Sequence, residues 1–172
     1  MKRKAVTFLV ILICFLIQST ILRFFQLGSI RPNLLLVVVA SFGFIRGKKT
    51  GMWVGVVCGL LADIFWGDLL GFYTMIYVLI GYINGSFRRL FYDEDVKLSL
   101  ALVGMSELIY GIFIYISRFM LQGEFDFSYY LFNIILSELV YTVLVTLVLY
   151  QIIFRINRKL ETEEQRSASR FV

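Results

Sequence analysis

The chain has 172 residues, of which 59% are hydrophobic, and it carries a net charge of +5 at pH 7. Its mean hydropathy is +0.82, whereas soluble domains contain about 45–50% apolar residues. This composition excludes an ordinary soluble domain and indicates a protein that is surrounded by lipid. The basic residues lie in short clusters between apolar runs, which indicates orientation in a membrane and not nucleic-acid binding.

Six apolar runs predict six membrane-spanning helices, because about 20 mostly apolar residues cross the hydrocarbon core. We expect them at residues 5–22, 32–45, 51–66, 69–87, 96–121 and 129–154. The second and third runs are short, so tilt or local thinning must accommodate them. The first run lacks a convincing cleavage site, which favours a retained helix over a signal peptide. The predicted fold is an all-α integral membrane bundle over residues 1–156.

Lysine and arginine are distributed unevenly between the two predicted sides of the membrane. If the N terminus is cytoplasmic, 14 of the 17 basic residues fall on cytoplasmic segments, and only Arg23, Arg31 and Arg118 fall outside. The positive-inside rule therefore predicts six spans with both termini in the cytoplasm. Residues 157–172 are charged, and we expect them to form a cytoplasmic tail that extends the last helix.

The third run has the most regular pattern, with small residues and one acid at steps of four: Gly51, Gly55, Gly59, Asp63 and Gly67. Such a stripe lets another backbone approach closely, so Gly59→Leu should be more harmful than the same change at Val38, which we expect to face lipid. An acid costs about 2.5–3.5 kcal/mol at the centre of a membrane helix. We interpret Asp63 as a hydrogen-bonded anchor for the turn into the fourth helix. The alternative is a ligand or partner site.

The start of the fourth helix offers further turn signals. Asp68 can cap its free amides, and Gly67 and Gly71 permit a sharp reversal of the chain. Later in this helix, four residues share one face: the aromatic Tyr77, the small Gly81 and Gly85, and the polar Asn84. We expect the Asn84 side chain to bind a local carbonyl or the inner loop.

Glu107 and Glu138 each lie about ten residues into their helices, which places both about 15 Å deep. Gly104 and Gly111 share the face of Glu107, and a polar stripe surrounds Glu138: Asn133, Ser137, Tyr141 and Thr142. Two carboxyl groups at one depth in hydrocarbon should not both be ionised. They could form a proton relay or a ligand site, or they could be protonated and join the helices by hydrogen bonds.

The sequence predicts no cofactor, metal or catalytic residue. It has no histidine, and Cys14 and Cys58 lie inside apolar runs without the spacing of a zinc site or disulfide framework. Motifs of hydrolases, nucleotide-binding proteins and metalloproteases are absent. An enzyme would need intramembrane catalysis, with Glu107 and Glu138 as the acid–base pair.

Two stretches resemble the MreD family of rod-shape-determining membrane proteins. One is Arg31-Pro32-Asn33 before an apolar run. The other combines Gly59-Leu60-Leu61-Ala62-Asp63, Gly67, Leu70-Gly71, Tyr77, Ile80-Gly81-Tyr82 and Gly85. The resemblance points to these structural or partner-binding candidates: Pro32, Asn33, Gly55, Gly59, Asp63, Gly67, Gly71, Tyr77, Gly81 and Gly85. It assigns no role to Glu107 or Glu138.

The resemblance implies a non-catalytic scaffold of the elongation complex in the bacterial inner membrane, which supports rod shape and lateral peptidoglycan synthesis. Its implied partners are an MreC-like protein, MreB filaments, a RodA-type polymerase and a penicillin-binding transpeptidase, besides membrane lipid. The Asp63 turn and the glycine stripe would then shape an outer surface for the MreC-like protein.

The family is also similar in fold to substrate-binding subunits of energy-coupling-factor transporters. The alternative function is therefore a vitamin-like small-molecule binding subunit. Such a subunit should show a small-residue face on its first helix, but here Leu9, Ile13 and Ile17 follow Ala5.

Overall fold

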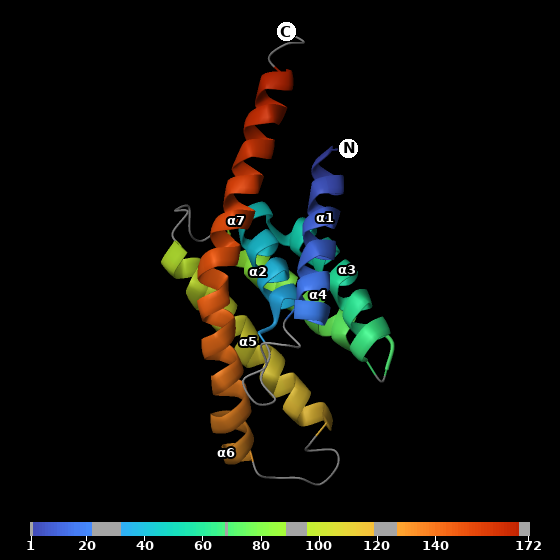
Figure 1. The fold of residues 1–172 in the computed structure, drawn as a ribbon, viewed down its shortest axis with the longest axis vertical. Helices are drawn as coiled ribbons and strands as arrows, with labels where there is room; N and C mark the ends of the chain where they lie inside the picture. The colour runs from blue at the N-terminus through green and yellow to red at the C-terminus, as the bar shows by residue number, and fades with distance from the viewer. Residues whose placement is uncertain (1, 22–31, 68, 89–95, 119–126, 169–172) are drawn as a thin grey trace.

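The computed structural model describes residues 2–21, 32–67, 69–88, 96–118 and 127–168, and the regular structure within these ranges is entirely helical (Figure 1). The helices are α1 (Lys2–Leu16) with its π-helical continuation η1 (Ile17–Ile21), α2 (Leu34–Arg46), α3 (Lys48–Trp66), α4 (Phe72–Phe87), α5 (Val96–Arg118), α6 (Phe127–Tyr130), the π-helical η3 (Leu131–Ile135) and α7 (Leu136–Ala168). Helix α1 continues into η1, and α6 continues through η3 into α7, so the elements form six continuous helical rods. Each of the six predicted runs corresponds to one of these rods.

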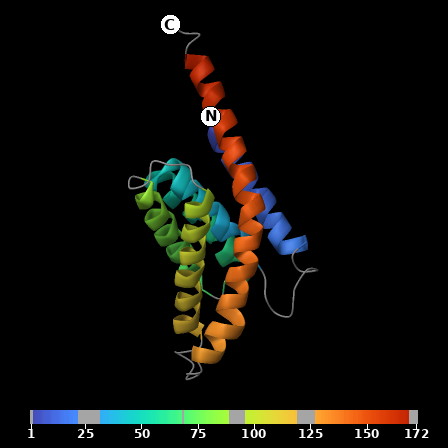
Figure 2. The same cartoon turned by 90° about the vertical axis from the view of Figure 1, so that its left-hand side faces the viewer.

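Four of these rods are long and apolar enough to cross a membrane: Arg3–Thr20, Lys48–Trp66, Lys97–Ser117 and Leu131–Leu160. The other two, α2 and α4, are apolar but have only 13 and 16 residues. The third helix is longer than the predicted run 51–66, because α3 already begins at Lys48 and has 19 residues. Both termini lie at the same end of the molecule (Figures 1 and 2).

Helix α2 lies at the centre of the fold. Every residue from Leu34 to Phe44 is buried, and α2 contacts α1, α3, α4, α5 and α7. A helix that is apolar all round is stable only where other helices cover every face. The enclosure also explains how so short a helix is accommodated, because protein and not lipid surrounds it.

A single glycine joins α2 to α3. Gly47 has φ +90°, its amide donates to the Gly43 carbonyl at 2.8 Å, and its carbonyl accepts from the Gly51 amide at 3.0 Å. Residues with a Cβ rarely adopt this backbone conformation. The two helices therefore reverse direction without a loop, which brings the glycine stripe of α3 beside α2 and α4.

The backbones of α3 and α4 are in direct contact along the glycine stripe. A Cβ added to Gly55 would lie 2.6 Å from the Tyr77 carbonyl oxygen, and one on Gly59 would lie 2.8 Å from the Thr74 nitrogen. On the other side, Gly81 meets the backbone of Gly51, and Gly85 meets that of Gly47 and Lys48. We call the closely packed helices α2, α3 and α4 the central unit.

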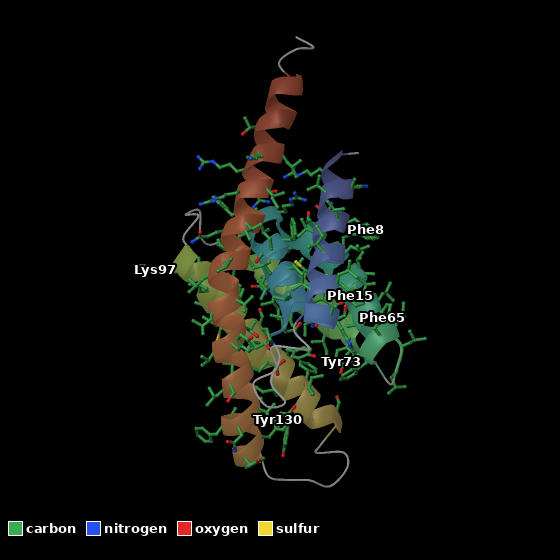
Figure 3. All side chains as sticks on the ribbon, in the orientation of Figure 1. Phe8, Phe15, Phe65, Tyr73, Lys97 and Tyr130 are labelled. Atoms are coloured by element: carbon green, nitrogen blue, oxygen red, sulfur yellow. The ribbon has the colours of Figure 1, made fainter. Side chains whose placement is uncertain are left out.

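The other helices attach to this unit from outside. Phe15 of α1 contacts Phe65 and Trp66 of α3, with ring centroids 4.8 and 5.4 Å apart (Figure 3). Helices α5 and α7 pack on each other and on α2, and their lower halves extend beyond the central unit (Figure 2). At that end, Tyr115 of α5 contacts Tyr130 of α6 at 5.2 Å.

The prediction for Val38 is wrong. Its side chain is 0% exposed, because α2 is covered on all sides and has no lipid-facing position along this stretch. A large residue at Val38 therefore tests the core and not the lipid-facing surface.

We predict that Gly59→Ala lowers the melting temperature in detergent, because the new methyl group overlaps the α4 backbone and overpacking costs about 1–3 kcal/mol. The matched control is Gly104→Ala on α5, where the nearest atom is a Val143 methyl group at 3.9 Å. The control should keep or raise the melting temperature, since alanine favours a helix by about 1 kcal/mol over glycine. Equal melting temperatures for the two variants would refute the backbone contact.

Candidate functional site

The Asp63 carboxylate caps the start of α4. Its Oδ2 accepts from the Gly71 amide at 2.9 Å, the Thr74 amide at 3.2 Å and the Thr74 hydroxyl at 2.5 Å, and its Oδ1 accepts from the Tyr73 amide at 2.8 Å. Asp63 is 2% exposed. The first amides of a helix lack partners within the helix and favour negative charge. One side chain near the end of α3 therefore satisfies two amides in the first turn of α4 and the amide of Gly71, which directly precedes it.

Two glycines shape the turn between α3 and α4. Gly71 has φ +99° and directly precedes α4, and only a residue such as glycine adopts this conformation without strain. The Gly67 amide donates to the Asp63 carbonyl at 3.1 Å, and a Cβ on Gly67 would lie 2.7 Å from that carbonyl oxygen. Asp68, which the sequence singled out as a cap, lies outside the described residues.

Asn33 joins three helices at the start of α2. Its side-chain Oδ1 accepts from the Leu36 backbone amide at 3.2 Å and from the Tyr77 hydroxyl at 2.9 Å. Its backbone amide donates to the Thr142 hydroxyl at 3.2 Å. Pro32, directly before it, is buried. Asn33 therefore caps α2 and links that helix to α4 and α7 in the interior of the bundle.

Asn84 makes a similar link further along α4. Its amide donates to the Ile80 carbonyl at 2.9 Å, as the sequence predicted, and also to the Ser106 hydroxyl of α5 at 2.7 Å. Tyr77 and Tyr110 stack with ring centroids 5.9 Å apart, and Tyr73 lies 6.3 Å from Tyr110. These contacts fill the space between α4 and α5 with aromatic rings and one amide.

Glu107 and Glu138 come together where α5 crosses α7. Gly104 lies opposite Val143 and Gly111 lies opposite Ile135, so this antiparallel register places Glu107 beside the turn of α7 that carries Glu138. Glu107 interacts electrostatically with Glu138 and lies near the Thr142 hydroxyl. Glu107 is 1% exposed, yet neither of its carboxylate oxygens makes a hydrogen bond with a described residue.

Sequence reasoning missed a polar cluster at the end of the molecule that holds both termini. Arg46 at the end of α2 donates to the Asn157 side chain at 2.6 Å and to the Thr7 hydroxyl at 2.7 Å, and its guanidinium lies over the Phe42 ring. Arg46 thereby ties α2 to α7 and α1. A basic residue at a helix end predicts orientation only, so nothing local in the sequence reveals these distant partners.

The described residues bring no three histidine, cysteine, aspartate or glutamate side chains together as a metal site. Cys14 and Cys58 are buried and free. The polar side chains of Asp63, Asn33 and Asn84 join helices through these hydrogen bonds.

Comparison with known proteins supports the resemblance carried by the motifs. The model of the family described as "rod shape-determining protein MreD" matches residues 2–160. No curated protein matches the chain, and no solved structure matches it, so the likeness to energy-coupling-factor subunits stays a prediction. Because the match covers nearly the whole chain and the fold holds several apolar helices, we conclude that this multi-pass membrane protein belongs to the MreD family of rod-shape-determining proteins.

Proposed function

We propose that this chain is a membrane scaffold of the bacterial elongation complex, located in the inner membrane with both termini in the cytoplasm. Its proposed partners are an MreC-like protein first, and MreB filaments, a RodA-type polymerase and a penicillin-binding transpeptidase beyond it. The role is to hold these proteins together during lateral peptidoglycan synthesis and not to catalyse a reaction.

The use of the Asp63 carboxylate is the observation that carries this proposal. A carboxylate has about four lone-pair positions, and four donors from the start of α4 surround Asp63. This leaves it little capacity to hold a ligand or take part in acid–base chemistry. Asp63, the acid of the motif that resembles the family, therefore holds α3 and α4 together. A scaffold protein requires such a stably packed helical bundle.

The glycine stripe supports the same proposal through its contact with the backbone of α4. Gly51, Gly55 and Gly59 are buried, and their added Cβ atoms would all meet the backbone of α4. An intact central unit leaves no room for a partner on this face. We therefore propose that Asp63 and the glycines act on partner binding indirectly, by holding the central unit together.

The alternative function, a small-molecule binding subunit, gains support only from the unpaired Glu107 carboxyl group. A thermal-shift screen of the purified protein with vitamins separates the two proposals. Strong stabilisation by one vitamin at nanomolar concentration would favour the transporter subunit over the scaffold.

We predict that Asp63→Leu lowers both the melting temperature and the recovery of a coexpressed MreC-like protein, because α4 loses its cap. Loss of a helix cap alone costs about 0.5–2 kcal/mol. In a rod-shaped bacterium depleted of its own MreD, this variant should leave cells round, whereas the wild-type chain should restore rods. Unchanged stability together with unchanged partner recovery would contradict the proposal.

We also predict that the α2–α3 turn faces the cytoplasm. A membrane-impermeant maleimide applied to intact cells should label Leu70→Cys at the opposite end of α3, but should label Lys49→Cys only after permeabilisation. Leu70 and Lys49 are exposed, and the native Cys14 and Cys58 are buried, so background labelling should be low. Labelling of Lys49→Cys in intact cells would invert the proposed orientation.

A further inference from the structure

Three cationic side chains come together where α3 begins and α4 ends, at the end of the central unit nearest the two termini (Figure 1). We propose that Lys48, Lys49 and Arg88, here called the basic turn, bind the phosphate of an anionic phospholipid in the leaflet at this end of the molecule. The inference goes beyond the scaffold role, because it concerns the lipid around the protein and needs no protein partner.

The first observation is that glycine contacts fix where the three cations start. Lys48 and Lys49 begin α3 directly after Gly47, and Arg88 follows the last residue of α4. A Cβ on Gly85 would overlap the Lys48 backbone, so the last turn of α4 lies against the first turn of α3. Arg88 Nη1 lies 3.4 Å from the position that a Cβ on Gly47 would take. Two helices therefore deliver their cations to one place.

The second observation is the aromatic side chains beside these cations. Lys48 Nζ lies 4.9 Å from the centroid of the Tyr82 ring on α4, within the range of a cation–π contact. Tyr82 is 45% exposed, and Trp53, four residues after Lys49 on α3, is 73% exposed. Amphipathic aromatic rings prefer the headgroup level of a bilayer, and long basic side chains reach the same level. The basic turn therefore lies where lipid phosphates lie.

The third observation is an apolar row that continues this surface toward the middle of the bilayer. Leu79 and Met75 precede Tyr82 at steps of three and four along α4, so the three side chains share one face of that helix. Leu79 is 39% exposed and Met75 is 61% exposed. The order of cationic, aromatic and apolar residues matches the order of phosphate, glycerol and acyl chain in one phospholipid. The surface therefore fits a lipid better than a soluble anion, which has no acyl chain.

The charge of the basic turn selects the headgroup. Phosphatidylglycerol carries a net negative charge, whereas phosphatidylethanolamine also carries an ammonium group, which the three cations repel. Each lysine or arginine near an anionic bilayer surface strengthens binding about fivefold. The positive-inside rule would be satisfied by cations anywhere on this side. Their convergence from two helices beside an aromatic surface is what indicates a binding site.

The test uses tryptophan fluorescence, because the sequence contains two tryptophans and Trp66→Phe leaves Trp53 as the single reporter. This variant is reconstituted alone in phosphatidylcholine vesicles that contain either phosphatidylglycerol or phosphatidylethanolamine with brominated acyl chains. Brominated chains quench a tryptophan that they touch, so phosphatidylglycerol should quench Trp53 more strongly at equal mole fraction. Equal quenching by the two lipids would overturn the inference and would leave the scaffold role untouched.

Charge variants in the same background assign the effect to the basic turn. Lys49→Gln should lower the preference for phosphatidylglycerol about fivefold, and Lys49→Glu should abolish it. The matched control is Arg158→Gln, which removes an exposed cation of α7 and should leave the preference unchanged. Equal losses in Lys49→Gln and Arg158→Gln would indicate a general effect of net charge and would overturn the inference.

Two controls keep this result interpretable. Lys49 is exposed, so its variants should keep the wild-type melting temperature in detergent; Arg88→Gln, also at an exposed position, replaces them if they do not. Inorganic phosphate at constant ionic strength should not relieve the quenching of Trp53 by phosphatidylglycerol. Full relief would identify a soluble anion as the ligand and would overturn the assignment to a lipid.

Discussion

One set of hydrogen bonds supplies donors to the Asp63 carboxylate and an acceptor to the first amides of α4. A carboxylate inside a bilayer needs donors, and the first amides of α4 need acceptors because no preceding helical turn supplies them. The four donors around Asp63 satisfy both needs at once. The bonds form only if α4 starts directly beside the end of α3, so they fix the position of one helix relative to the other.

The glycine stripe makes that position attainable. Because Gly55 and Gly59 carry no side chain, the backbone of α4 lies against α3 along most of its length, and interhelical van der Waals contact is the main attraction between helices in lipid. The polar cap and the close backbone contact depend on the same alignment. Asn33 then links this unit to α7 through Thr142, and Asn84 links it to α5 through Ser106.

The sequence revealed those features that depend on local spacing. Asp63, Gly67 and Gly71 lie within one turn region, and a stripe at steps of four is visible without knowledge of the fold. The sequence could not reveal contacts between residues that lie far apart in the chain. Asn33 and Thr142 are separated by 109 positions, and Arg46 and Asn157 by 111. It also misjudged Val38, because an apolar helix surrounded by protein and one surrounded by lipid have the same composition.

Hydrogen–deuterium exchange of the protein in nanodiscs tests the Asp63 cap most directly. The account predicts that the amides of Gly71, Tyr73 and Thr74 exchange as slowly as those in the middle of α4, although they lie at the start of that helix, and that they exchange rapidly in Asp63→Leu. Rapid exchange of these three amides in the wild-type protein would contradict it.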